Sequence, residues 1–364
     1  MKQGVIWARE ALNVAFQTRR RHQKSFGAGD HFDNAAAFEY KESMFARLAT
    51  SVVALSVFVF RSPQRTAVPS PLTDHHQHLF SPEASRLSPR QSEMLDAAGL
   101  VALLDSAGIA RAVILSVAYQ FGNPNRPPIE NEYEKVKAEN DWTSAQVHRF
   151  PNRLRGFCGV NPLKSYALEE IARCARDPML RTGLKLHFGN SDVDLDNPVH
   201  REQLRRVFAA ANANRMAIVI HMRSSVTMHR PYGAREVHAF LDDVLPSAPD
   251  VIVQIAHLAG AGEYDDSQDA ALSVFVNAVA RHDRRMAHVL FDVSGEAGYG
   301  DWKAKARLIA SRIRQLGMQR ILFGADGSIG DSLKPREAWQ AFLELPLLPE
   351  EFRVIAENVA PYLN

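Results

Sequence analysis

The sequence predicts an α/β fold of the (β/α)8 type, a TIM barrel. From residue 71 onward, eight short runs rich in Val, Ile and Leu recur, which is typical of strands buried on both faces of a parallel sheet. Segments with the apolar spacing of amphipathic helices separate these runs. Polar residues stand at the ends of the runs, where barrel enzymes carry their active sites. A doubly wound open sheet is the weaker alternative, because no Gly-rich phosphate-binding turn follows any run.

The predicted strands and helices alternate along the whole of 71–364. The strand-like runs are 72–79, 111–118, 154–161, 182–188, 216–222, 251–257, 287–294 and 320–326. The helix-like segments are 92–107, 130–148, 166–176, 198–214, 234–245, 268–282, 303–316 and 335–345. Segment 198–214 shows the pattern well, since its apolar residues fall on one helical face and Asp196 or Asn197 can cap its first turn.

The first seventy residues differ from this body. Residues 1–43 show no sustained period and are interpreted as an upstream extension without its own fold. Residues 48–60 carry no charge, which matches the length of a signal-peptide core and is short for a membrane span. We therefore expect 44–70 to be an export signal starting at Met44 plus a linker, and the protein to be periplasmic or secreted. The alternatives are an uncleaved N-terminal anchor, or a buried helix in a cytoplasmic protein.

Composition places the chain among globular proteins and argues against nucleic-acid binding. Hydrophobic residues make up 46% and charged residues 23%, with a formal net charge of +2. The body 71–364 holds 33 basic and 36 acidic residues, so it lacks a basic footprint. Two cysteines, Cys158 and Cys174, are too few for a disulfide framework or a Cys-based zinc site. We expect buried free thiols, with a single bridge as the alternative in an exported protein.

The first predicted strand contains the segment Asp74-His75-His76-Gln77-His78. Side chains alternate along a strand, so Asp74, His76 and His78 should share one face, and His75 and Gln77 the other. Neutral imidazole nitrogens are good ligands for zinc and similar ions. His76 and His78 alone are only a modest indication of a metal site, which needs further ligands from other strands.

Those partners stand at the ends of later strands: Lys185, His187, His221, His257, Asp292 and Asp326. A polar residue that closes an apolar run is costly unless it is paired or binds a ligand. In a barrel all of these side chains would meet at one end.

These motifs resemble the amidohydrolase superfamily, in the amidohydrolase-related branch that contains hydrolases and zinc-dependent decarboxylases of the aminocarboxymuconate-semialdehyde type. The matching segments are D-H-H-Q-H at 74–78, G-L-K-L-H at 183–187, I-V-I-H at 218–221, Q-I-A-H-L-A-G at 254–260 and F-G-A-D at 323–326. The resemblance covers 71–364 and says nothing about 1–70.

The resemblance implies that His76, His78, His221 and Asp326 hold one divalent metal ion, Zn2+ in the first place, with Mn2+, Co2+ or Fe2+ as alternatives. It also implies that His257 is the catalytic histidine. Three imidazoles and one carboxylate leave a coordination position for water, as in catalytic zinc sites. Asp326 is the expected base and proton donor to the leaving group, and His257 is expected to polarise the substrate carbonyl.

Other residues are assigned supporting roles. Lys185 and His187 are expected to bind substrate; the alternative for Lys185 is a carboxylated lysine that bridges two metals. Arg223 is predicted to clamp an anionic substrate group. Asp292 is expected to orient a metal-binding histidine, and Asp74 and Asn140 to support the ligands or the pocket without binding the metal.

The sequence therefore predicts a metal-dependent hydrolase whose activated water attacks an amide, a lactone or a similar carbonyl substrate. The alternative is a zinc-dependent, non-oxidative decarboxylase of a carboxylated small molecule, and a metal-binding barrel without catalysis ranks last. The expected partner is a small-molecule substrate, and a homodimer is the default assembly.

Overall fold

The computed structural model describes residues 68–87, 95–224, 230–327 and 332–364, which belong to one compact unit. The predicted extension 1–43 and residues 44–67 of the predicted leader lie outside the described residues. Among the described residues, no helix combines the length and the apolar character needed to cross a membrane.

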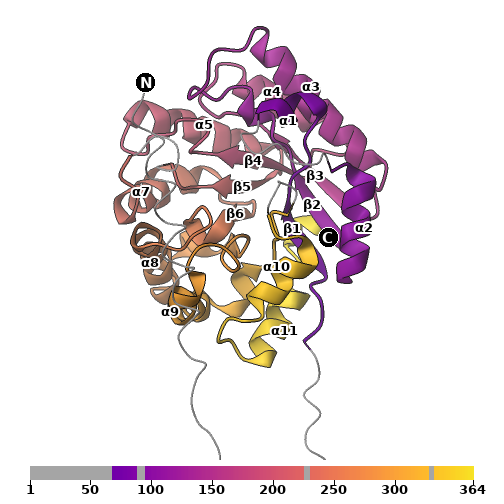
Figure 1. Ribbon diagram of the computed structural model, residues 1–364. Coiled ribbons are helices and arrows are strands. Elements are labelled where there is room, and N and C mark those ends of the chain that lie inside the picture. Colours follow the sequence, from indigo (N-terminus) through magenta and orange to yellow (C-terminus); the bar gives the residue numbers. More distant parts are fainter. Residues whose placement is uncertain (1–67, 88–94, 225–229, 328–331) are drawn as a thin grey trace, which may run out of the picture. The chain divides into compact units, whose positions relative to one another are not determined.

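Eight parallel strands form the centre of the molecule and helices surround them (Figure 1). The strands are β1 (Thr73–Gln77), β2 (Arg111–Leu115), β3 (Leu154–Gly159), β4 (Gly183–His187), β5 (Ala217–His221), β6 (Val253–Ile255), β7 (Val289–Asp292) and β8 (Ile321–Leu322). Each strand pairs with the next one in the chain. The backbone N–H of His75 donates to Phe323 O at 2.8 Å, and that of Asp326 donates to His76 O at 2.8 Å, which joins the end of the sheet to its start. The predicted barrel is confirmed.

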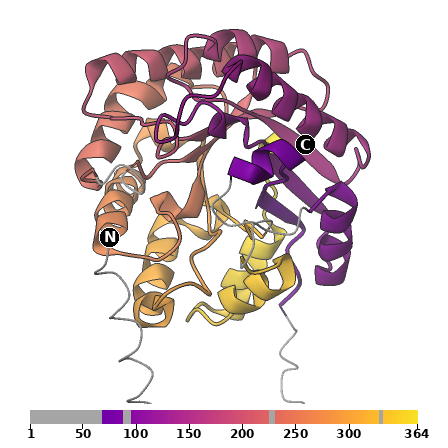
Figure 2. The same cartoon turned by 45° about the horizontal axis from the view of Figure 1, so that its top comes forward.

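The helices follow the strands in the chain and lie around the outside of the barrel (Figure 2). They are α1 (Pro82–Leu87), α2 (Ala97–Ala107), α3 (Glu132–His148), α4 (Ala167–Cys174), α5 (Pro198–Ala213), α7 (Ala234–Ala239), α8 (Asp266–Ala280), α9 (Trp302–Leu316), α10 (Pro335–Phe342) and α11 (Pro349–Glu357). Helix α5 begins as predicted, with the Asn197 side chain accepting from the N–H of Val199 at 2.9 Å. Helix α2 begins later than predicted, because Asp96 caps it by accepting from Gly99 N at 2.9 Å.

All eight strands occur where the sequence predicts them, but several are shorter. β6 ends at Ile255 and β8 at Leu322, so His257 and Asp326 lie in the segments that follow the strands. Both residues have left-handed backbone angles, with φ of 53° at His257 and 50° at Asp326. Such angles end the extended conformation and are uncommon for residues other than Gly, Asn and Asp. They cluster at functional sites more often than elsewhere.

The interior of the barrel has its own apolar cluster. Val113 and Leu115 of β2 point into it, whereas their neighbours Ala112 and Ile114 pack in the larger core against the helices, as strand alternation requires. The same interior cluster contains Phe157, Ala217, Val219, Ala256 and Leu363, with Tyr362 packed against it. The short turn Pro361–Leu363 thus closes one end of the interior.

Cys158 in β3 and Cys174 in α4 form a disulfide across a sequence separation of 16. The prediction of two free thiols is therefore wrong. Both cysteines are fully buried, as predicted. The error arose because a strand and the following helix meet in space at these two positions, which spacing in the sequence does not reveal.

Candidate metal centre

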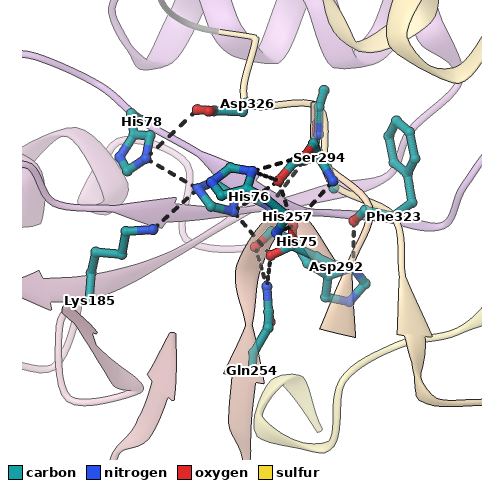
Figure 3. Close-up of polar contacts among 12 residues, drawn as sticks. His75, His76, His78, Lys185, Gln254, His257, Asp292, Ser294, Phe323 and Asp326 are labelled. Atoms are coloured by element: carbon teal, nitrogen blue, oxygen red, sulfur yellow. Dashed lines mark hydrogen bonds and ion pairs between the residues drawn. The ribbon is translucent and has the colours of Figure 1, made fainter. Parts of the chain in front are cut away.

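The imidazoles of His76 and His78 face each other with Nε2 atoms 3.3 Å apart (Figure 3). Each ring uses its other nitrogen elsewhere: His76 Nδ1 lies 3.0 Å from Asp292 Oδ2, and His78 Nδ1 lies 2.6 Å from Leu115 O. These acceptors require a proton on both Nδ1 atoms, so both Nε2 atoms carry lone pairs. Two lone pairs at this distance repel each other unless a cation lies between them. The donor set therefore fits a metal ion.

Asp326 completes a group of three candidate ligands. Its Oδ1 lies 3.7 Å from His78 Nε2, and the ligand atoms of His76, His78 and Asp326 all lie within 4.8 Å of one another. The left-handed turn at Asp326 is fixed by its N–H, which donates to His76 O. Two residues earlier, a Cβ on Gly324 would come within 2.7 Å of His76 Cβ. Only glycine lets the segment pass this close to β1.

His221, the fourth predicted ligand, lies beside this group and is not part of it. Its ring stacks on His187 with centroids 3.9 Å apart, and the ring of His257 lies at 5.0 Å. The buried Nε2 of His221 makes no hydrogen bond with any described residue. A buried nitrogen without a partner is costly, which is consistent with a ligand position.

The imidazoles of the site are neutral. Burial lowers the pKa of His76 to about 3, assisted by the nearby Lys185 ammonium. Burial likewise holds the pKa values of His78, His187, His221 and His257 below the ordinary value. Metal ions bind the neutral imidazole, so these rings are ready to act as ligands without losing a proton.

Asp292, predicted to orient a histidine ligand, receives hydrogen bonds on both oxygens. Its Oδ2 accepts from His76 Nδ1 at 3.0 Å and from Gln254 Nε2 at 2.7 Å. Its Oδ1 accepts from Ser294 Oγ at 2.5 Å and from His257 N at 3.1 Å. Burial alone would raise the pKa of Asp292, but His76, His257 and Ser294 outweigh it and hold that pKa well below the ordinary value. Asp292 therefore stays ionised and links the histidines of β1 and of the turn after β6.

Sequence analysis missed Gln254 and Ser294. Gln254 interrupts the apolar run of a buried strand, and Ser294 follows Asp292 by two residues. An amide in the middle of a run such as V-I-V-Q-I is a usable signal, because it needs a buried partner. The serine carries no comparable signal.

His257 stands in an unusual turn, in which His257, Leu258 and Ala259 all have positive φ. Gln268 Nε2 donates to His257 O at 3.0 Å, and Tyr232 Oη donates to Ala259 O at 2.7 Å. These bonds hold a conformation that is strained for residues with a side chain. The Nδ1 of His257 lies 2.9 Å from Ser294 O and carries the proton, so Nε2 is left as the nitrogen that can accept a hydrogen bond in the cavity.

Lys185 is fully buried in β4, and its ammonium lies close to the candidate ligand His76. Its Nζ lies 3.3 Å from His76 Nε2. Burial lowers the pKa of Lys185 to about 8, opposed by the charges of Asp292 and Asp326. Lys185 and His187 both line the cavity, as expected of groups that meet a substrate.

Two other predicted residues, Arg223 and Asn140, make their hydrogen bonds to residues other than the candidate ligands. Arg223 donates to Asp265 Oδ2 at 2.7 Å and is not part of the described cavity lining. Asn140 of α3 bonds to both backbone groups of Gly159, at 3.0 and 2.9 Å, and to Glu170 at 2.7 Å. It ties α3 to the end of β3.

Asp74 supports β1 from within the barrel wall. It accepts from Ala325 N at 3.1 Å and from Gln77 Nε2 at 2.7 Å. The prediction that Asp74 and Gln77 occupy opposite faces is wrong, because the register of β1 shifts between these two residues. Burial raises the pKa of Asp74 to about 7.

The site opens into a cavity of about 390 Å³ at the ends of the strands. Polar and aromatic residues from most of the strand-following segments line it: His78, Phe80, Tyr119, Gln120, Lys185, His187, Asn190, His221, His257, Glu263, Tyr299, Asp326 and Ser332. Its size suits a small molecule with several polar groups.

Three solved structures share the fold of this chain. A 5-carboxyvanillate decarboxylase from Sphingomonas paucimobilis aligns with a TM-score of 0.54 at 15% identity, over 79% of this chain and 97% of that one. A probable 2-pyrone-4,6-dicarboxylic acid hydrolase from Acinetobacter baumannii aligns with a TM-score of 0.52 at 14% identity, over 78% and 95%. A 5-carboxyvanillate decarboxylase from Novosphingobium aromaticivorans, solved with bound manganese, aligns with a TM-score of 0.52 at 12% identity, over 81% and 96%.

No curated protein shows significant similarity to the sequence. The profile of the amidohydrolase family, however, matches residues 73–358, which includes every strand of the barrel and all of the candidate ligands. The chain therefore belongs to the amidohydrolase family and is an enzyme of its amidohydrolase-related branch, a hydrolase or a carboxy-lyase.

Proposed function

We propose that this enzyme is a metal-dependent hydrolase that cleaves an amide, a lactone or a similar carbonyl compound. The observation that carries the proposal is the pair of facing Nε2 lone pairs on His76 and His78, with the carboxylate of Asp326 beside them. A divalent ion held there would supply Lewis-acid polarisation and bring the pKa of water towards ~7.

Asp326 is the proposed proton carrier. Its side chain is about 30% exposed in the cavity, whereas Asp292 is fully buried and committed to hydrogen bonds. During hydrolysis the bond from the carbonyl carbon to the leaving nitrogen or oxygen breaks and a bond to water oxygen forms. Asp326 would accept the proton that water loses and pass it to the leaving group.

His257 is the proposed second acid–base group. With Nδ1–H bonded to Ser294 O, the neutral ring presents Nε2 as an acceptor. In this form it can accept a proton from water or from a substrate hydroxyl. To polarise a carbonyl oxygen, as the sequence predicts, the ring must first become an imidazolium, and burial opposes that charge.

Lys185 and His187 are proposed to bind the polar part of the substrate. A buried ammonium 3.3 Å from a ligand nitrogen gains most from an anionic partner, because burial makes its unpaired charge costly. We therefore infer a substrate that carries a carboxylate or an enolate near the reacting carbonyl.

The same ammonium favours a second candidate, a non-oxidative decarboxylase. There the carbon–carboxylate bond would break, carbon dioxide would leave, and Asp326 would protonate the carbon. Two of the three similar structures described above are named decarboxylases, which supports this alternative without deciding between the two.

A screen of the metal-loaded enzyme separates the two reactions. Lactones, amides and carboxylated aromatic acids would be offered in parallel, with pH-stat detection of hydrolysis and detection of released carbon dioxide. Turnover of lactones or amides without carbon dioxide supports the hydrolase, and carbon dioxide from an aromatic acid supports the carboxy-lyase. Metal analysis of the same samples identifies the ion, with Zn2+ the first expectation. Activity that persists unchanged after complete metal removal would overturn the proposal.

We also propose that the protein is exported. Disulfides persist in oxidising compartments and are rare in the cytosol, so the Cys158–Cys174 bond supports this location. Cell fractionation with an antibody against the barrel tests it: recovery in the cytosolic fraction alone would contradict export.

A further inference from the structure

Tyr362 reaches the barrel interior from the side opposite the cavity, in the short turn Pro361–Leu363. Its ring packs edge-on against Phe157, with centroids 5.2 Å apart, and against His75 at 6.5 Å. The segment is anchored beside β1, because Ala360 N donates to His75 Nε2 at 3.2 Å. The phenol hydroxyl then donates to Gln254 Oε1 at 2.6 Å.

This hydroxyl is the first member of a continuous hydrogen-bond chain that ends at a metal-ligand candidate. Gln254 Nε2 donates to Asp292 Oδ2 at 2.7 Å, and the same oxygen accepts from His76 Nδ1 at 3.0 Å. Gln254, Asp292 and His76 have no solvent-exposed surface, so water does not compete for these bonds.

The phenol has a specific task in this chain. A glutamine amide can be turned over with almost no change of shape, which exchanges its oxygen and nitrogen. If the amide of Gln254 turned over, its oxygen would face the ionised Asp292, and two acceptors would oppose each other. A hydroxyl that donates to Oε1 favours the orientation in which Nε2 faces Asp292. Burial keeps the pKa of Tyr362 well above its ordinary value, so the phenol retains the proton that it donates.

We propose that Tyr362 is a positioning residue for the metal centre: its hydroxyl orients Gln254, Gln254 fixes Asp292, and Asp292 fixes the tautomer and tilt of His76. The inference rests on the proposed function, because it requires that His76 binds a metal ion. It assigns a role in metal affinity to a residue on the opposite side of the barrel from the substrate cavity.

The test is Co2+ binding by the full chain, measured after metal removal with a chelator. The visible absorption of bound Co2+ reports both the dissociation constant and the ligand geometry, independently of activity. Tyr362→Phe keeps the ring and its contacts with Phe157 and removes only the hydroxyl. We expect Co2+ to bind about fivefold more weakly, with a changed absorption spectrum, because a loosened outer hydrogen bond lowers the affinity of a metal site. Tyr133→Phe is the matched control, since its hydroxyl bonds to Glu170 at 3.3 Å, away from the site, and we expect no change.

A double-mutant cycle with Gln254→Met separates this role from simple packing. If the phenol acts through Gln254, adding Tyr362→Phe to Gln254→Met leaves the dissociation constant unchanged. Additive losses would mean that the two side chains act independently, and would overturn the inference. So would wild-type affinity and spectrum in Tyr362→Phe. If Tyr362→Phe does not fold, Gln254→Met alone provides the test. Weaker Co2+ binding by Gln254→Met supports the proposed series of hydrogen bonds, and unchanged binding overturns it.

Failure of the proposed function gives a different result. His76→Ala should abolish the Co2+ spectrum. A wild-type chain that shows no Co2+ spectrum dependent on His76 would disprove the metal centre itself, whereas a normal wild-type spectrum that Tyr362→Phe leaves unchanged would disprove only the role of Tyr362.

Discussion

The carboxylate of Asp292 and the imidazole of His76 form a fully buried hydrogen bond of 3.0 Å between β7 and β1. In this pair the carboxylate accepts the proton on Nδ1, so Nε2 keeps a lone pair that could bind the proposed metal ion. Asp292→Asn removes the charge and leaves an amide that can present either a donor or an acceptor to His76. We expect the metal affinity to fall by about 10- to 100-fold.

Competitive titration with a chromogenic chelator measures this loss. Asp105→Asn is a suitable control, because Asp105 is exposed and pairs with Arg153 at 2.6 Å, away from the site. Equal affinity in Asp292→Asn and the wild type would contradict the orienting role.

Asp326→Asn should remove activity while leaving the fold intact. The amide cannot accept a proton from water, and the loss of an acid–base group costs about 10²- to 10⁴-fold in kcat. Activity would be compared at matched metal content, because Asp326 is also a candidate ligand. A variant with full metal occupancy and unimpaired kcat would show that another group carries the proton.

Gly324→Ala should displace β1 at His76, against which Gly324 packs. The added methyl group would lie 2.7 Å from His76 Cβ, closer than real Cβ atoms approach, and neither backbone can yield easily. We expect the free energy of unfolding to fall by about 1–3 kcal/mol, together with weaker metal binding. In Gly233→Ala the nearest atom, Ala270 Cβ, is 3.7 Å away, so this control should unfold like the wild type. Chemical denaturation of both variants distinguishes them.

The sequence reveals most of the barrel because its strands are buried on both faces. Apolar runs such as A-I-V-I-H at 217–221 are stable only where both faces of the strand are buried. Their regular alternation with helices favours a parallel sheet in which each strand pairs with the next. The ligand candidates were found for the same reason, since a histidine that closes such a run is conspicuous. The strand ends were less visible: the turn at His257 depends on side chains of Gln268 and Tyr232, which come from distant segments.

Contacts made by ordinary residues were not predictable. Ser294 contacts Asp292 and His257, and Tyr362 contacts Gln254, through hydrogen bonds that nothing in the local sequence pattern indicates. The disulfide was missed because two cysteines in a strand and a helix look like any buried pair. Helix α11 went unrecognised because it follows β8 and α10, beyond the strand–helix repeat that guided the prediction.

Glu139 of α3 should make stability depend on pH. Its side chain is buried, its Oε1 accepts from Ser81 N at 3.1 Å, and burial raises its pKa from 4.5 to about 7. Between these values the folded chain keeps a proton that the unfolded chain has released, so the free energy of unfolding falls as the pH rises. Over this pH range the free energy of unfolding falls by roughly 3 kcal/mol in total.

Glu139→Gln should abolish this contribution. Urea unfolding at pH 5 and pH 8 would show a smaller difference in the variant than in the wild type. Glu344→Gln, at an exposed position, should keep the wild-type dependence. An equally steep dependence in Glu139→Gln would assign the effect to other groups.

The disulfide should contribute measurably to stability. It closes a loop with a sequence separation of 16, for which chain entropy gives about 3 kcal/mol. Cys174→Ala should therefore lower the free energy of unfolding by about 2–3 kcal/mol. The wild type in a strong reductant should lose a similar amount, and the variant should be insensitive to reductant. Mass spectrometry of the non-reduced protein, with and without alkylation, checks the bond directly.

The closure of the barrel also determines when, during synthesis and folding, the candidate metal ligands come together. His76 lies in the first strand and His78 directly follows it, whereas Asp326 and the Gly324 that packs against His76 come after the last strand. A nascent chain therefore offers an ion two neighbouring imidazoles on a flexible peptide, and the three-ligand group forms only when translation has passed residue 326. Because the three-ligand group exists only after ring closure, we expect the metal supply of the compartment in which the barrel folds to decide which ion this group binds.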